Sequence, residues 1–380
     1  MLQVGELPDP RPGAGEVRVR IWVSGVNPGD TKKRRGWLGS SMPYPRVVPH
    51  SDAAGVVDAV GSGVDPARVG RRVWVYGAQS YRPFGTAAEW TVVPDALAVD
   101  LPDGVSDEIG AVCGVPGITA HRAVFADGPV TGQDRPRPWR AGRVGSLAAQ
   151  VARWGGATVV GTVRTGADLD AAAGPAVALD QPDAAAAIRA HAPDGVDRVV
   201  EVPFSDNADL DAAVVKDLGI IAAYPTRDDR PGFPFWPMLF DNVTIRLLGR
   251  DDFPASAEQQ AAADLTAAAR DGALAIPVGP PLPLDRAAGA HDRIDAGSRE
   301  RVLLTIPDGQ RSYAASMDPE SRRPSTRDWL VRSAVLVVAV SVTAAVVFPS
   351  VGLGSWLHAG LLAAAVAVTG AASTRAATGS

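Results

Sequence analysis

Hydrophobic and polar positions change their spacing near residue 113. Before it, short apolar stretches bounded by glycine predict strands, and the first of them alternates apolar with polar residues. Short strands with glycine turns are typical of a small β-barrel-like domain. The predicted strands lie within EVRVRIWVSGV (16–26), AAGVVDAVGSGV (53–64), GRRVWVYGA (70–78) and GTAAEWTVVP (85–94).

After residue 113, helical patterns alternate with continuous apolar strands. Apolar strands between helices are typical of a parallel sheet that is covered on both faces. The predicted helices are 145–156, 182–192, 208–218 and 256–274, and the predicted strands are 157–163, 196–202, 219–224 and 299–307.

A third pattern begins after Pro307. Residues 309–332 are polar and rich in proline and serine, which predicts a linker. Residues 333–374 contain no Asp, Glu, Lys or Arg, and segments 333–351 and 355–372 each approach the roughly 20 residues of a spanning helix. Flanking arginines predict a helical hairpin with both ends in the cytoplasm. The alternative is an Ala/Val-rich tail that is a disordered or spurious extension.

The amino-acid composition excludes some classes of function. The chain has 380 residues, of which 46% are hydrophobic and 21% charged, and its net charge is −5. Without a long basic run, nucleic-acid binding has little support. The single cysteine, Cys113, excludes an internal disulfide and a cysteine-rich zinc site.

Several motifs occur together in family order. Residues 2–308 resemble the zinc-independent quinone oxidoreductase (zeta-crystallin-like) branch of the medium-chain dehydrogenase/reductase superfamily. The stretches that carry the resemblance are SGVNPGDTKKRRG, VVPHSDAAGVVDAVGSGV, RVWVYGAQSYRPFGTAAEWTVVP, CGVPGITAHRAV, VGSLAAQVARWGGATVVGTVR and NVTIRLLG.

The resemblance implies an α/β fold in which a Rossmann domain with a doubly wound parallel sheet interrupts a GroES-like β-barrel domain. The expected boundaries are 1–113 for the first part of the GroES-like catalytic domain, 114–245 for the Rossmann domain and 246–308 for the return. The linker 309–332 and the hairpin 333–374 follow. The implied activity is NADPH-dependent reduction of quinones or activated carbonyl and enone substrates by a cytoplasmic homodimer, tethered to the membrane if the hairpin inserts.

The stretch AGRVG predicts the cofactor turn. Gly142 would let the backbone approach a pyrophosphate, Gly145 would allow close packing of helix on strand, and Val144 lies between them. Arg164 and Thr165 end the next strand, where an arginine accommodates a 2′-phosphate and so favours NADPH. The alternatives are a glycine turn that merely starts a helix and a solvated surface arginine.

The resemblance also places Asn27, Thr119, Ala222 and Tyr224 beside the nicotinamide. Asn27, Thr119 and Tyr224 are candidate catalytic residues, with no general acid assigned. The alternatives are an Asx-type turn at NPGD (Asn27 to Asp30, before Thr31), a helix cap at Thr119 and a core tyrosine at Tyr224.

The zinc-binding motif of related enzymes is altered. In HSDAAG, Ser51 takes the place of the zinc histidine and Asp52 that of the glutamate, while His50 stands one residue early. No cysteine lies near Asn27, so three good ligands cannot be assembled and no metal is expected. Solvated or structural roles are expected for the remaining histidines, which are His121, His191, His291 and His358.

Two departures from the family concern missing strands. The family has a further strand before the first residues, so we expect the true start to lie upstream. Residues 134–140, DRPRPWR, stand where the family has the buried central strand, although they include two prolines and charged side chains. If encoded GAC CGT CCT CGT CCG TGG CGG, the same bases read one position later give Thr-Val-Leu-Val-Arg-Gly-Gly. We therefore predict a local frameshift here. The alternative function is a catalytically impaired, membrane-tethered homologue.

Overall fold

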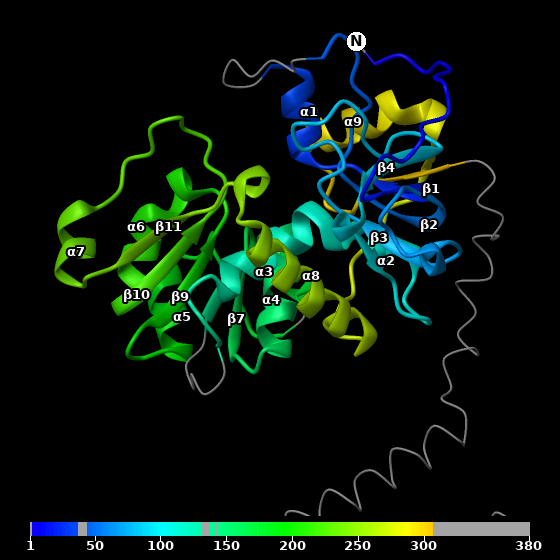
Figure 1. Cartoon of the computed structure of the whole chain (residues 1–380). Coiled ribbons are helices and arrows are strands. Elements are labelled where there is room, and N and C mark those ends of the chain that lie inside the picture. The colour runs from blue at the N-terminus through cyan, green and yellow to red at the C-terminus, as the bar shows by residue number, and fades with distance from the viewer. Residues whose placement is uncertain (1, 37–43, 131–136, 141–142, 173, 307–380) are drawn as a thin grey trace, which may run out of the picture. The chain divides into compact units, whose positions relative to one another are not determined.

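The computed structural model describes residues 2–36, 44–130, 137–140, 143–172 and 174–306 (Figure 1), with side chains left out at 137–140, 143 and 171. The predicted linker 309–332 and hairpin 333–374 lie outside these residues, so the hairpin stays a prediction. Within the described part, none of the helices has the length and apolar character needed to cross a membrane.

The first sheet contains the strands predicted before residue 113. Its order is β12-β13-β1-β2-β3-β5, with β4 also paired to β1. The alternating residues Val17, Val19 and Ile21 of β1 are buried, as the sequence pattern predicts for a sheet with one core face. The strands are β1 (Glu16–Gly25), β2 (Asp52–Val60), β3 (Arg72–Val75), β4 (Trp90–Pro94), β5 (Ala98–Asp100), β12 (Leu282–Pro283) and β13 (Leu303–Thr305).

The second sheet is parallel and has the order β11-β10-β9-β6-β7-β8. Its neighbouring residues point to opposite cores: Val200 packs with α3, α4 and α8, whereas Val199 packs with α5 and α6. Both faces are therefore covered, which explains the continuous apolar strands. The strands are β6 (Arg137–Arg140), β7 (Val159–Val163), β8 (Ala176–Ala178), β9 (Val196–Glu201), β10 (Val215–Ala223) and β11 (Thr244–Leu247).

Nine helices complete the described part of the chain, and Figure 1 shows them around the two sheets. They are α1 (Pro28–Arg34), α2 (Asp107–Val112), α3 (Ile118–Phe125), α4 (Arg143–Trp154), α5 (Ala184–His191), α6 (Phe204–Val214), α7 (Phe235–Phe240), α8 (Ala255–Arg270) and α9 (Ala287–Asp295).

The central strand β6 corrects one sequence prediction. We expected residues 134–140 to be unable to form this strand, yet Arg137–Arg140 pairs in parallel with β7. Towards β9 it makes a single bridge, Trp139 with Val200. The backbone groups of the apolar strands on either side need partners, which favours a strand here despite its side chains. The frameshift itself stays a prediction.

The boundary between α6 and β10 corrects another sequence prediction. A helix was predicted over 208–218, but α6 ends at Val214 and β10 begins at Val215. Two adjacent β-branched valines disfavour the helix. Leu218 has a φ of 60°, and the pairing of β10 with β9 shifts between Val215 and Ile220. This irregular start conceals the strand in the sequence pattern.

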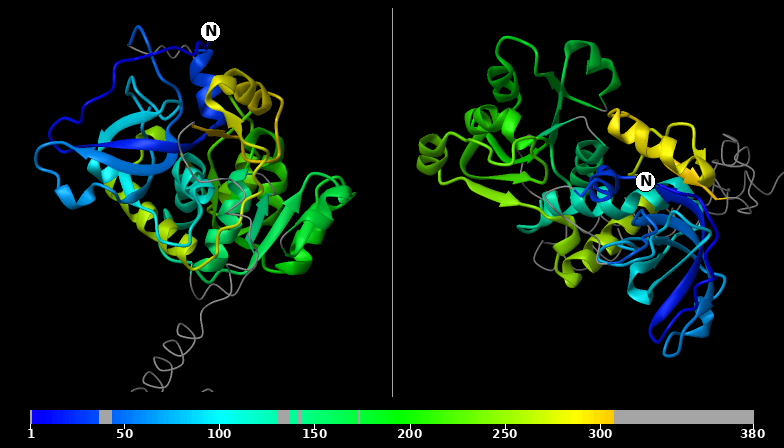
Figure 2. Two further views of the ribbon diagram at one scale, coloured as in Figure 1. Left: turned by 90° about the vertical axis from the view of Figure 1, so that its right-hand side faces the viewer. Right: turned by 90° about the horizontal axis from the view of Figure 1, so that it is seen from above.

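The end of the described chain returns to the first sheet. Strand β13 pairs with β1, and α9 packs against α1, which Figure 2 shows as neighbouring yellow and blue helices. Arg34 of α1 forms an ion pair with Asp295 of α9. This return brings Arg301, just before β13, into the same buried region as Asn27, just before α1.

Candidate active site

Asp52 joins the two nicotinamide-side candidates Asn27 and Thr119. Its carboxylate is fully buried; Oδ2 accepts a hydrogen bond from Asn27 Nδ2 (2.8 Å) and Oδ1 accepts one from the Val115 N–H (2.8 Å). Thr119 Oγ1 donates to the Val115 carbonyl (2.6 Å). One carboxylate therefore connects the start of α1 with the turn that precedes α3. Sequence reasoning assigned Asp52 only to the place of a zinc-motif glutamate and missed this role.

Arg301 completes the buried cluster, and no sequence signal marked it. Its Nη1 donates to Asn27 Oδ1 (2.7 Å) and to the Val26 carbonyl (2.7 Å). Its Nη2 donates to the Ala111 carbonyl (3.3 Å) and lies 3.5 Å from Asp52 Oδ2. Both ends of the Asn27 amide are thus held by side chains of opposite charge.

Two glycines leave room for this ion pair. A Cβ on Gly114 would lie 2.1 Å from Asp52 Oδ1, and a Cβ on Gly25 would lie 2.3 Å from Arg301 Nη2. Real Cβ atoms do not approach so closely, so a side chain at either position would displace the pair. Close packing therefore requires glycine at both positions.

Burial dominates the electrostatics of the cluster. It raises the pKa of Asp52, an effect that Arg301 and the Asn27 amide oppose. Burial also raises the pKa of Asp30, which accepts a hydrogen bond from the Asn27 N–H (2.7 Å), to about 7. It raises the pKa of Cys113 to about 12, which makes this thiol a poor nucleophile.

These contacts bear on the alternatives for Asn27 and Thr119. The Asn27 side chain bonds Asp52 and Arg301, while the Asp30 carboxylate caps the Asn27 N–H in the turn before Thr31. Thr119 lies inside α3, and its hydroxyl donates to a carbonyl four residues back. A helix cap instead accepts from an N–H, so capping does not account for Thr119.

The other site residues gather at the carboxyl ends of the parallel strands. Arg164 and Thr165 are exposed directly after β7, and Thr165 Oγ1 donates to Asp168 (3.1 Å). Ala222 is buried in β10, and Tyr224 follows that strand, half-buried. This is the edge at which ligands bind in open α/β sheets.

Helix α4 begins at the same edge because it follows β6. Gly145 is buried and Val144 half-buried in its first turn. Gly142 lies outside the described residues. The first turn of α4 therefore offers backbone N–H groups where a pyrophosphate would bind.

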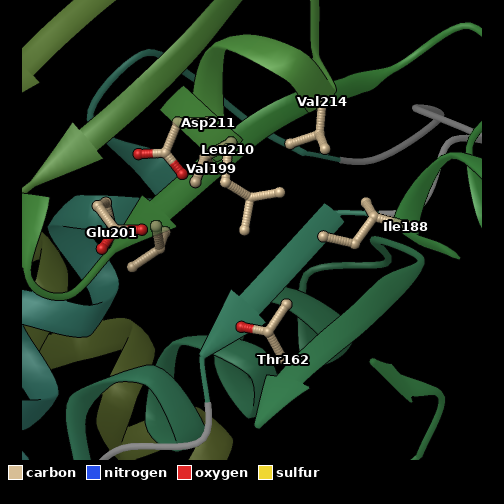
Figure 3. A pocket seen from close by; sticks show the side chains of 8 residues that line it. Thr162, Ile188, Val199, Glu201, Leu210, Asp211 and Val214 are labelled. Carbon is tan, nitrogen blue, oxygen red and sulfur yellow. The ribbon is translucent and has the colours of Figure 1, made fainter. Parts of the chain in front are cut away.

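A small cavity between the parallel sheet and helices α5 and α6 is separate from this cluster. Figure 3 shows Thr162, Glu201 and Asp211 among its lining residues. Its volume is about 20 Å³, which suits one water molecule. It therefore cannot accommodate a dinucleotide or a quinone.

His50, from the altered zinc motif, and His291, for which a solvated or structural role was expected, form a buried pair. His50 Nε2 lies 2.9 Å from His291 Nε2, and His50 Nδ1 lies 3.1 Å from Ser24 Oγ. Ser24 Oγ contacts Thr86 Oγ1, which donates to the Asp52 backbone carbonyl. Because a carbonyl only accepts, Ser24 must donate to Thr86 and His50 Nδ1 to Ser24. His291 Nε2 therefore donates to His50 Nε2.

The remaining histidines have separate surroundings. His121 Nε2 lies 2.8 Å from Asp264 Oδ2, His191 is exposed, and His358 lies outside the described residues. Across the described residues, no three His, Cys, Asp or Glu side chains are grouped closely enough to hold a metal ion.

The histidine pair should make stability depend on pH. Burial lowers the pKa of His291 from 6.5 to about 4, so the unfolded chain binds more protons between these values. The contribution of neutral His291 to the free energy of unfolding is therefore complete above about pH 6.5 and is lost as the pH falls towards 4. Between pH 6.5 and pH 4, the free energy of unfolding of the wild type should therefore fall. In His291→Gln we expect this fall to be smaller by about 1–3 kcal/mol.

Urea unfolding at several pH values measures this difference. His191→Gln, which changes the exposed histidine at the end of α5, is the matched control and should follow the wild-type curve. Parallel curves for wild type and His291→Gln would contradict the prediction.

The fold and the clustered site residues define a class. Helix α4, which carries Gly145, begins at the carboxyl edge of a six-stranded parallel sheet. The strands of the other sheet, which are mostly antiparallel, and the segments that flank them supply Asn27, Asp52 and Arg301. This is the architecture of a medium-chain dehydrogenase/reductase. The profile of the alcohol dehydrogenase GroES-like domain matches residues 13–103.

Comparisons with individual proteins indicate one branch of this superfamily. Rat (Rattus norvegicus) quinone oxidoreductase is 28% identical over 309 residues, covering 78% of this chain and 91% of the relative. The structure of Pseudomonas syringae pv. tomato quinone oxidoreductase superposes with a TM-score of 0.68 at 25% identity, covering 79% and 94% of the two chains. The mycobacterial Rv1454c structure, complexed with NADPH, gives 0.65 at 27% identity with the same coverage. The chain is therefore similar to the quinone oxidoreductase-like branch of the superfamily.

Proposed function

We propose that this chain is an NADPH-dependent, zinc-free oxidoreductase that reduces quinones or activated carbonyl and enone compounds. The observation that carries the proposal is the Asn27–Asp52–Thr119 network beside a parallel sheet whose carboxyl edge presents Arg164. The names of the rat and Pseudomonas relatives and the NADPH bound to the mycobacterial one support it.

The residues present suit this cofactor. The N-terminus of α4 would hold the pyrophosphate and Arg164 the 2′-phosphate. The nicotinamide would bind at the carboxyl end of β10, where Ala222 is buried and Tyr224 follows the strand. When bound, NADPH supplies a hydride to the acceptor, and a proton from solvent completes its reduction.

Asn27 and Thr119 would orient the reactants. An amide has two N–H groups and two acceptor lone pairs, and Asp52 and Arg301 engage one of each. We infer that the second N–H of the amide faces the nicotinamide or the acceptor oxygen. Tyr224 is the third candidate, since it follows the end of β10 at the same edge. Membrane contact through residues 333–374 is a prediction from the sequence alone.

The cofactor assignment predicts a selective effect of Arg164→Ala. Loss of a charge-assisted contact to the 2′-phosphate should raise the KM for NADPH about 10-fold to 100-fold and leave the KM for NADH nearly unchanged. Steady-state rates with both nucleotides and a panel of quinones and enones test the function and the assignment together.

Arg270→Ala, at the exposed end of α8, is the matched control and should leave both constants unchanged. Equal use of NADH and NADPH by the wild type would refute the assignment. A wild type without turnover across the panel would refute the proposed function and favour the catalytically impaired alternative.

We also propose that two copies associate through α7 and β11. Trp236 and Phe240 of α7 are 65% and 72% exposed, and Leu247 of the edge strand β11 is 75% exposed. Large exposed apolar side chains near the free edge of a sheet are typical of an interface. We expect light scattering to show a dimer that Trp236→Asp with Phe240→Asp converts to a monomer. Leu169→Asp, on an exposed leucine elsewhere, should stay dimeric, and a monomeric wild type would refute the proposal.

A further inference from the structure

We propose that Asp52 and Arg301 are positioning residues, which hold the amide of Asn27 and the turn before Thr119 in the single arrangement that the hydride-transfer site requires. This inference rests on the proposed function. It assigns a role to a buried ion pair whose members lie 249 positions apart in the sequence.

The first argument is the orientation of the Asn27 amide. Its Nδ2 faces the Asp52 carboxylate and its Oδ1 faces the Arg301 guanidinium. A flipped amide would direct its oxygen at the carboxylate and its N–H groups at the guanidinium, and both contacts would be repulsive. A neutral pair of partners would discriminate between the two orientations far less. The charges therefore select one orientation.

The second argument is that Asp52 couples two parts of the site. Its second oxygen accepts from the Val115 N–H, and the Val115 carbonyl accepts from the Thr119 hydroxyl. A shift of the carboxylate would move Asn27 and the turn before α3 together. Pre-organisation of this kind matters because misplacement of a reactant by about 1 Å can cost about 100-fold in rate.

The third argument is that stability alone does not explain the pair. Both side chains are almost fully buried, and burying two charges carries a desolvation penalty that apolar side chains of similar volume avoid. Gly25 and Gly114 leave the space that the pair occupies. An arrangement that costs desolvation and requires two glycines suggests a function beyond packing.

The test compares single and double charge removal in the full-length protein. We would make Asp52→Asn, Arg301→Met and the double variant, and measure Tm together with kcat and the KM for NADPH and a quinone. Each single variant should lower Tm, because it leaves one buried charge unpaired. The double variant should recover most of that loss, whereas its kcat should stay at least 10-fold below the wild-type value with a smaller change in KM.

The matched control is the Arg18–Asp58 ion pair on the same sheet, with the N–O distance at 2.8 Å and no contact with Asn27. Arg18→Met with Asp58→Asn should keep the wild-type kcat. Arg301→Lys is the second variant: it retains the charge, but one ammonium cannot reproduce the geometry of the guanidinium. Its kcat should fall while Tm stays close to that of the wild type.

Wild-type kcat in a folded double variant, or in Arg301→Lys, would overturn the inference and leave only a structural role. If the double variant does not fold, Arg301→Lys decides the matter by itself, and its failure to fold as well would mean that the pair is structural. A wild type without turnover would overturn the proposed function and this inference with it. An active wild type beside an equally active double variant would overturn the inference alone.

Discussion

Replacing residues 134–140 with Thr-Val-Leu-Val-Arg-Gly-Gly is expected to raise Tm by about 10 °C and to tighten NADPH binding about 10-fold or more. Strand β6 lies at the centre of the parallel sheet, yet it makes only one bridge to β9. Pro138 cannot donate to the ladder. The replacement puts valine, leucine and valine at 135–137, leaves one arginine in place of three, and restores the backbone N–H donors that the two prolines lack.

The same replacement should improve the cofactor site because β6 leads into the first turn of α4, where Gly145 lies. Thermal unfolding and NADPH fluorescence titration measure the two effects. Pro8→Val, in the exposed amino-terminal segment, also removes a proline and should change neither quantity. A restored chain that is less stable, or that binds NADPH no better, would contradict the prediction. Resequencing the nucleotides over this stretch tests the frameshift separately.

Gly114→Ala is expected to abolish most of the turnover and to lower the free energy of unfolding by about 1–3 kcal/mol. The new Cβ would lie 2.1 Å from Asp52 Oδ1, so the carboxylate or the turn must move. This clash is the reason for the expected loss. Moving Asp52 breaks its bonds to Asn27 and Val115 at once.

Gly289→Ala in α9 is the matched control. Its new Cβ meets nothing within 4 Å, so this change should be neutral or stabilise the helix by about 0.5–1 kcal/mol. Urea unfolding and kcat with NADPH and a quinone measure both variants. Wild-type activity in Gly114→Ala would show that the site tolerates displacement of Asp52.

The local pattern was sufficient for most of the architecture. Alternation in β1 and the apolar runs of β7 and β9 predicted the two kinds of sheet, because which faces are buried determines the spacing of apolar residues. The same pattern failed at β10, where the irregular start at Leu218 conceals the strand. It failed again at β6, because the neighbouring strands, rather than its own residues, favour an extended backbone there.

The same distinction between local pattern and tertiary structure applies to the residues of the site. The sequence by itself predicted Arg164 at a strand end from local spacing, and its resemblance to a known family indicated the class of protein and the position of Ala222. Only the tertiary structure decided that Arg301 contacts Asn27, that Asp52 joins Asn27 to the turn before Thr119, and that His50 pairs with His291. The physical reason is that these contacts join segments far apart along the chain, so no periodicity within any one segment records them.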